Sequence, residues 1–130
     1  MIYLDAGVAL SALFLESRRP DAAFWSKQFV ASRLFEYEIL NRLHMRKAGD
    51  DDIDCARAMI ARVDLIDLSA MSLARALDPF PVQVRTLDSL HLATMVFLRS
   101  RAQTIQLATY DRRFGDAALA LGFELAATGG

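Results

Sequence analysis

The chain has 130 residues, of which 54% are hydrophobic, and a formal net charge of −1, so it fits one domain over residues 1–130 and shows no overall attraction to nucleic acid. No apolar run reaches the roughly 18 residues that a membrane helix needs, and the acidic Asp5 follows the start too closely for a signal peptide. A single cysteine, Cys55, excludes an internal disulfide and a zinc cluster of thiolates, and it favours a cytoplasmic location.

Strands and helices are expected to alternate along the chain, because short apolar runs that end at turn residues are followed by apolar residues at helical spacing. In chain order, we expect a strand at 2–4, helices at 8–15 and 21–28, a strand at 29–31, helices at 32–47 and 50–63, a strand at 65–68, a helix at 70–77, a loop at 78–81, a helix at 86–99, a strand at 105–109, a helix at 112–121 and an edge strand at 123–125. Ser32, Ser69 and Thr86 are the expected helix N-caps. Unbroken apolar strands that alternate with helices indicate a parallel α/β sheet covered on both faces.

Two acids stand just beyond expected strands: Asp5 follows the first strand and Asp111 follows the fourth. In open parallel sheets, ligands bind beyond the carboxyl ends of the strands, near the point where the strand order reverses. If the first and fourth strands are neighbours at that point, both acids face one cleft. The alternative is that each acid only caps the helix that follows it.

Two further acids interrupt apolar helices. Asp88 lies in the first turn of the helix at 86–99, where it also suits the helix dipole, and Glu38 lies inside the helix at 32–47. Four acids that meet in one cleft repel each other unless cations neutralise them, and carboxylate oxygens select Mg²⁺ or Mn²⁺. Such ions activate water and stabilise the leaving oxygen of a phosphodiester.

Four segments of the chain resemble, in order, the four motifs of the PIN-domain ribonucleases known as VapC toxins. They are Tyr3-Leu4-Asp5, Glu38-Ile39-Leu40-Asn41, residues 85–93 and residues 108–113. The third motif is the most specific, and the resemblance extends over residues 2–125. It implies a three-layer α/β/α sandwich, endoribonuclease activity on RNA that needs Mg²⁺ or Mn²⁺, a homodimer and a cognate VapB-like antitoxin.

Carried over by position, the resemblance makes four residues the acidic tetrad that holds the metal: Asp5, Glu38, Asp88 and Asp111. Glu36 competes with Glu38. Helical spacing places apolar residues beside Glu36, whereas the motif has its acid directly before the aliphatic pair, which favours Glu38. Asp116 is a candidate fifth acid. The family often has Ser or Thr two residues after the first aspartate, where this chain has Gly7, and Thr109 is the candidate to supply a hydroxyl instead.

His91 and the basic residues have two interpretations each, and the large apolar side chains predict a contact surface. His91 follows Asp88 by one helical turn, so it either reaches the scissile phosphate or packs inside the apolar helix. The basic residues near 42–47 and the arginine pairs at 18–19 and 112–113 either flank the path of RNA or form a solvated face. Large side chains in the N-terminal half are expected to form an exposed patch for a second copy: Leu10, Leu13, Phe14, Phe24 and Trp25.

Two other functions are compatible with parts of the pattern. A PIN-like binding module without catalysis would keep the fold, but the presence of all four motif acids argues against it. An aspartate-based phosphatase also has an acid after its first strand, but it has a second aspartate where this chain has Gly7.

Overall fold

The computed structural model describes residues 1–129, and its five strands form one parallel sheet in the order β3-β2-β1-β4-β5. The strands are β1 (Ile2–Leu4), β2 (Phe29–Ser32), β3 (Val63–Ile66), β4 (Gln106–Ala108) and β5 (Glu124–Leu125). The helices are α1 (Ala6–Leu13), the 3₁₀ helix η1 (Ala22–Ser26), α2 (Leu34–Met45), α3 (Asp50–Ile60), α4 (Ala70–Leu77), α5 (Thr86–Ser100) and α6 (Arg112–Ala120). The predicted α/β class with a parallel sheet is confirmed.

Strand β1 is the centre of the sheet and pairs with β2 on one side and β4 on the other. Tyr3 lies opposite Val30 of β2 and Leu107 of β4. Every residue of β1 and β2 is buried, because helices cover both faces at the centre of the sheet. Strand β5 lies at the edge of the sheet, which confirms the edge strand predicted at residues 123–125, and both of its residues are exposed.

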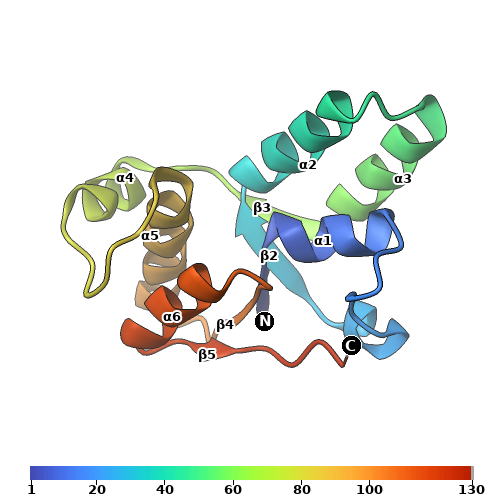
Figure 1. Cartoon of the computed structure of the whole chain (residues 1–130). Helices are drawn as coiled ribbons and strands as arrows, with labels where there is room; N and C mark the ends of the chain where they lie inside the picture. Colours follow the sequence, from blue (N-terminus) through green and yellow to red (C-terminus); the bar gives the residue numbers. More distant parts are fainter. Residues whose placement is uncertain (130) are drawn as a thin grey trace.

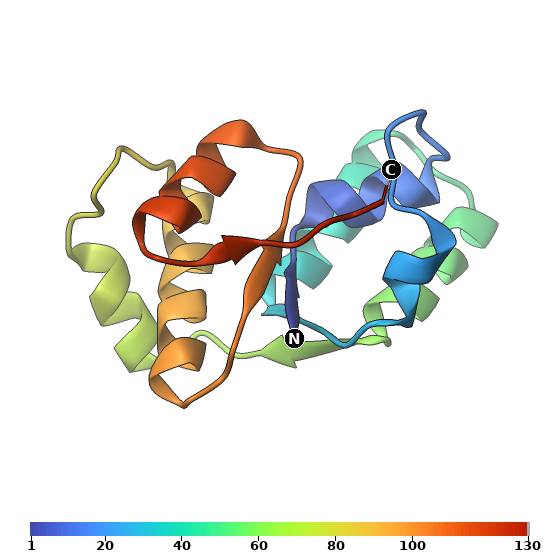
Figure 2. The ribbon, with the colours of Figure 1, turned by 90° about the horizontal axis from the view of Figure 1, so that it is seen from below.

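Two layers of helices cover the sheet (Figure 1). The chain runs from β1 through β2 to β3, and then returns past β1 to β4 and β5. Right-handed crossovers therefore put α1 to α3 on one face and α4 to α6 on the other. Figures 1 and 2 show this division, with α1, α2 and α3 grouped on one side of the strands and α4, α5 and α6 on the other. The three-layer α/β/α sandwich is confirmed.

The helix expected at 21–28 is only one short 3₁₀ turn, η1. The side chain of Asp21 accepts a hydrogen bond from the Phe24 N–H at 3.0 Å, as a helix N-cap does. The following residues then form an aromatic cluster, in which the ring centroid of Phe24 lies 5.0 Å from that of Trp25 and 5.2 Å from that of Phe29. Since Phe29 already belongs to β2, this packing leaves no room for a longer helix.

Strand β3 begins at Val63, two residues before the expected start, and α3 ends at Ile60. Val63 is buried and pairs with Phe29 of β2. Helical spacing had assigned Val63 to the preceding helix, but its pairing with β2 makes it the first residue of the strand. The exposed Asp64 is tolerated because β3 lies at the edge of the sheet.

Of the three expected N-caps, Ser69 is confirmed: its hydroxyl accepts from the Ser72 N–H at 3.1 Å. Arg33 and Arg85 occupy the N-cap positions of α2 and α5, where Ser32 and Thr86 were expected. Ser32 ends β2, where its backbone pairs with Ile66 of β3, but its hydroxyl still accepts from the Leu34 N–H at the start of α2, at 3.1 Å.

The prediction of an exposed apolar patch in the N-terminal half is wrong for Leu10 and Phe24, which are buried in the core. Leu13, Phe14 and Trp25 are partly buried and pack against the core. Exposed large apolar side chains lie elsewhere, and on α4 they include Leu73 and Leu77, which are 44% and 87% exposed. No helix within residues 1–129 combines the length and the apolar content of a membrane span.

Candidate functional site

The candidate site lies at the carboxyl end of the sheet, between β1 and β4. These strands are neighbours and the chain leaves them toward opposite edges, so the strand order reverses here. Asp5 directly follows β1, and its backbone N–H donates to the carbonyl of Ala108 at the end of β4, at 3.0 Å. The condition under which Asp5 and Asp111 face one cleft, adjacent first and fourth strands, is therefore met.

Asp5 is held by a neighbouring strand end and does not cap the helix that follows it. The Thr109 hydroxyl donates to Oδ2 of Asp5 at 2.6 Å, while the Asp5 side chain makes no capping hydrogen bond to α1. Burial raises the pKa of Asp5 to about 6. The Thr109 bond opposes that rise, and the nearby charges of Glu38 and Asp88 add to it. The hydroxyl expected from Thr109 is therefore present at Asp5.

Asp111 does cap its helix, as one of the two interpretations proposed. Its Oδ1 accepts from the backbone N–H groups of Arg113 at 2.9 Å and Phe114 at 3.4 Å, at the start of α6. Its other oxygen, Oδ2, accepts from the guanidinium of Arg85 at 3.1 Å. The Asp111 N–H also donates to the Thr109 hydroxyl at 3.0 Å, so Thr109 links Asp5 to Asp111.

Asp88 lies in the first turn of α5, close to Asp111 and to Arg85. Burial raises the pKa of Asp88, and the charge of Asp111 adds to this, whereas Arg85 and His91 oppose it. The Arg85 Nε lies 3.8 Å from Oδ2 of Asp88, so a single guanidinium serves two acids. This role of Arg85 was not predicted, although its position three residues before Asp88 is a signal for such a contact.

Glu38 reaches the site from α2 and binds a buried histidine. The Nε2 of His91 lies 2.5 Å from Oε1 of Glu38, and the Nδ1 of His91 lies 2.7 Å from the Tyr3 hydroxyl. His91 is only 3% exposed, which confirms that its side chain packs in the interior on the buried face of α5. The partnership with Glu38 was not expected, because 53 residues separate the two in the sequence.

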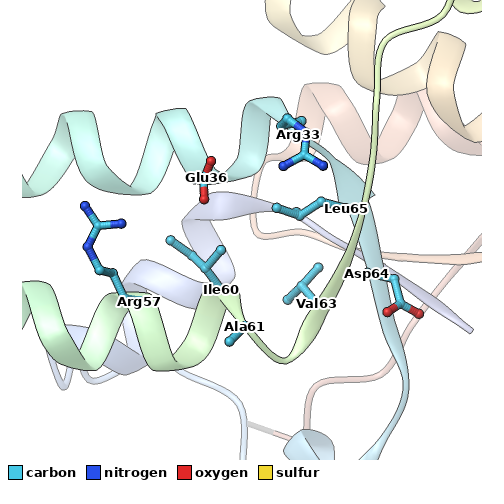
Figure 3. Close-up of a pocket in the computed structure, with 8 residues that line it drawn as sticks. All are labelled: Arg33, Glu36, Arg57, Ile60, Ala61, Val63, Asp64 and Leu65. Atoms are coloured by element: carbon cyan, nitrogen blue, oxygen red, sulfur yellow. The ribbon is translucent and has the colours of Figure 1, made fainter.

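Glu36 lies in different surroundings from Glu38. It lines a pocket between α2, α3 and β3 together with Arg33, Arg57 and Leu65 (Figure 3). Glu38 instead lines a groove beside α1 and raises the pKa of Asp5 through its charge. The structure thus brings Glu38 to the other acids and leaves Glu36 apart from them. Asp116 is exposed on α6.

The four acids have the oxygen donors that a hard divalent cation prefers, but they are not gathered into a metal-binding cluster. Carboxylate oxygens without sulfur are the donors that Mg²⁺ and Mn²⁺ prefer. Within residues 1–129, no three Asp, Glu, His or Cys side chains lie close enough together to hold a metal as they stand. Protein donors occupy the carboxylates instead: Thr109 binds Asp5, His91 binds Glu38, and Arg85 binds Asp88 and Asp111.

The raised pKa of Asp5 predicts how a neutral replacement affects stability in the absence of metal. A folded-state pKa of about 6, above the ordinary value of 3.8, means that the fold favours the protonated acid at low pH and loses this contribution as the pH rises through 6. We therefore expect the stability advantage of Asp5→Asn over the wild type to grow between about pH 4 and pH 8, by on the order of 1–2 kcal/mol.

Urea unfolding in EDTA measures this difference, with Asp54→Asn on the exposed face of α3 as the control. A constant difference between Asp5→Asn and the wild type across this pH range would contradict the expectation.

The sequence matches the family profile of the PIN domain over residues 2–119. Two curated relatives from Mycobacterium tuberculosis are similar over almost the whole chain. Ribonuclease VapC35 is 28% identical over 134 aligned residues, which cover 99% of this chain and 98% of that protein. Ribonuclease VapC46 is 32% identical and covers 97% of this chain and 96% of its own length.

Two solved structures share the fold. A crystal structure of VapBC2 from Rickettsia felis bound to a DNA fragment from their promoter superposes with a TM-score of 0.69 at 16% identity, over 97% of this chain and 98% of that one. A toxin–antitoxin complex from Klebsiella pneumoniae superposes with a TM-score of 0.64 at 14% identity, over 92% and 94% of the two chains. At these identities, the superpositions establish the fold alone. Together with the profile match over residues 2–119 and the identity to VapC46, they establish that this chain belongs to the PIN-domain family.

Proposed function

We propose that this chain is a metal-dependent endoribonuclease and the toxin of a VapBC-type toxin–antitoxin pair, working in the cytoplasm as a single domain over residues 1–130. The observation that carries the proposal is the set of motif acids at the reversal point of the sheet, where Asp5 and Asp88 have raised pKa values. The relatives named ribonucleases VapC35 and VapC46 support it.

In this proposal, Mg²⁺ or Mn²⁺ is held by the acidic tetrad: Asp5, Glu38, Asp88 and Asp111. A bound ion of this kind supplies activation of water and stabilises the charge of the leaving oxygen. Thr109 keeps the Asp5 carboxylate at the end of β1. Arg85 balances the charge of Asp88 and Asp111, and its side chain is 66% exposed, so it can move away when a cation takes over that task.

The groove beside Glu38 is the proposed path of the RNA. It is lined by residues of α1 and α2, including Arg42, and by Phe14 and Arg46, which directly follow the two helices. The guanidinium of Arg46 lies 3.8 Å from the centroid of the Phe14 ring. Arginine contacts phosphate through a planar fork. A local basic wall of this kind explains how a chain with a net charge of −1 can bind RNA.

A PIN-like binding module without catalysis is the second candidate function. It is favoured because no three metal-binding side chains cluster within residues 1–129. A cleavage assay on single-stranded RNA separates the two functions. The nuclease needs Mn²⁺ or Mg²⁺ and stops on chelation, whereas the binding module retains RNA without cutting it under either condition.

Asp88→Asn should abolish RNA cleavage, because it removes a proposed ligand and keeps the size of the side chain. We expect a loss of roughly 100-fold or more in the Mn²⁺-dependent cleavage rate, with the fold retained. A gel assay of RNA cleavage measures the rate, and Asp54→Asn on α3 is the matched control. Cleavage by Asp88→Asn within a few-fold of the wild type would remove Asp88 from the proposed site.

The two glutamates of α2 form a second matched pair. Glu38→Gln should reduce cleavage strongly, whereas Glu36→Gln should keep most of the activity, because only Glu38 lies among the other acids. The same cleavage assay measures both variants. Retained activity in Glu38→Gln together with loss in Glu36→Gln would show that Glu36, and not Glu38, belongs to the site.

The proposed partners are RNA, a cognate antitoxin and a second copy of this chain. A homodimer buries apolar surface, and Leu73 and Leu77 lie one turn apart on the exposed side of α4. Light scattering at micromolar concentration should give the mass of a dimer, and Leu77→Glu should shift it toward the monomer. A monomer mass for the wild type contradicts the dimer, and an unchanged dimer of Leu77→Glu contradicts the α4 interface.

A further inference from the structure

A continuous series of hydrogen bonds leads from the centre of the sheet to Glu38. The backbone N–H of Ser32, at the end of β2, donates to the Tyr3 hydroxyl at 3.0 Å. That hydroxyl lies 2.7 Å from Nδ1 of His91 on α5, and Nε2 of His91 lies 2.5 Å from Oε1 of Glu38 on α2. We propose that His91 is a positioning residue that fixes the Glu38 carboxylate for metal binding, and that Tyr3 fixes His91 in turn.

The proton positions follow from the chemistry of the partners. An ionised carboxylate only accepts hydrogen bonds, so Nε2 of His91 carries a proton and donates to Glu38. The Tyr3 hydroxyl already accepts from Ser32, so its own proton is free to donate to Nδ1 of His91. Each nitrogen of the imidazole thus has one defined partner, and the ring cannot flip without losing both.

Packing holds the same orientation. Tyr3 is fully buried and His91 is 3% exposed. The Tyr3 ring meets the imidazole edge-on with 5.8 Å between centroids, and the Phe114 ring lies 6.0 Å from it. An imidazole enclosed in this way has no water as an alternative partner, so its direction is set by the fold before any ligand arrives.

The bond between His91 and Glu38 joins the two helical layers, because α5 and α2 cover opposite faces of the sheet. Glu38 has a side chain that is 21% exposed, whereas His91 lies inside. The buried group therefore holds the partly exposed one, and it engages Oε1 while Oε2 has no hydrogen-bond partner within residues 1–129. A free second oxygen in a fixed direction is what a metal ligand requires, and partners of this kind typically change metal affinity by roughly 10–100-fold.

The test rests on the proposed function, since it takes Glu38 as a ligand, and it measures Mn²⁺ binding by the metal-stripped chain without RNA. His91→Gln and His91→Asn place their amide nitrogens differently. The Gln amide nitrogen falls near the place of Nε2 and can donate to Glu38, whereas the Asn amide falls near Nδ1 and cannot reach it. We expect His91→Asn to weaken Mn²⁺ binding by roughly 10–100-fold and His91→Gln to retain most of the affinity.

Tyr3→Phe removes one oxygen from the core and should weaken Mn²⁺ binding by a smaller factor than His91→Asn. Ser11→Ala is the matched control. The Ser11 hydroxyl is also buried but donates within α1 to the Val8 carbonyl, at 2.6 Å, so this variant should leave Mn²⁺ affinity unchanged. Thermal unfolding of each variant shows that binding is measured on a folded chain, and Tyr3→Phe keeps the test open if His91→Asn does not fold.

Glu38→Gln separates failure of this inference from failure of the proposed function. If Glu38→Gln leaves Mn²⁺ affinity unchanged, Glu38 is not a ligand and the proposed metal site is wrong. If Glu38→Gln weakens binding but His91→Asn and Tyr3→Phe alter only thermal stability, the positioning role of His91 is wrong. The role also requires that His91→Asn has no further effect on Mn²⁺ affinity in the Glu38→Gln background, and an equal effect in both backgrounds overturns it.

Discussion

Burial of carboxylates at one end of the sheet, beside other acids, is the constraint to which the rest of this site responds. Asp5 and Asp88 both have raised pKa values because burial and neighbouring acids disfavour their charged forms. Three side chains serve the four acids. Thr109 donates to Asp5, His91 to Glu38, and Arg85 contacts Asp88 and Asp111. Each donor lies on a different element from the acid it serves, except at the Arg85–Asp88 contact. The site is therefore held by the assembled fold.

The parallel sheet makes this arrangement possible. Its strands all end on the same side, and adjacency of β1 and β4 places Asp5 next to Thr109, 104 residues away. The two helical layers then approach each other beyond the strand ends, where α2 brings Glu38 and α5 brings His91. Sheet order decides which side chains meet, and the crossovers decide from which face they come.

Much of the fold could be predicted because it follows from local patterns. The order of strands and helices and the Ser69 cap depend on residues within one or two turns of each other, and the covered parallel sheet follows from unbroken apolar strands that alternate with helices. Failures occurred where side-chain packing or strand pairing overrides the local pattern: η1 is short because Phe24 packs on Phe29, five residues on, and β3 starts early because Val63 pairs with Phe29 across 34 residues of chain. Two of the apolar side chains expected at the surface, Leu10 and Phe24, belong to the core.

For the site, the sequence provided the acids but not their partners. Periodicity pointed to Glu36 and the motif to Glu38, and only the placement of α2 against α5 separates them. The polar role of Tyr3 could not be predicted from its burial. It looks like an ordinary aromatic of the central strand, yet its hydroxyl satisfies both Ser32 and His91. A purely apolar replacement would leave two buried polar groups without a partner. Tyr3 therefore cannot be varied like an ordinary buried apolar residue when this core is repacked for stability. The same restriction applies to natural sequence drift in the interior.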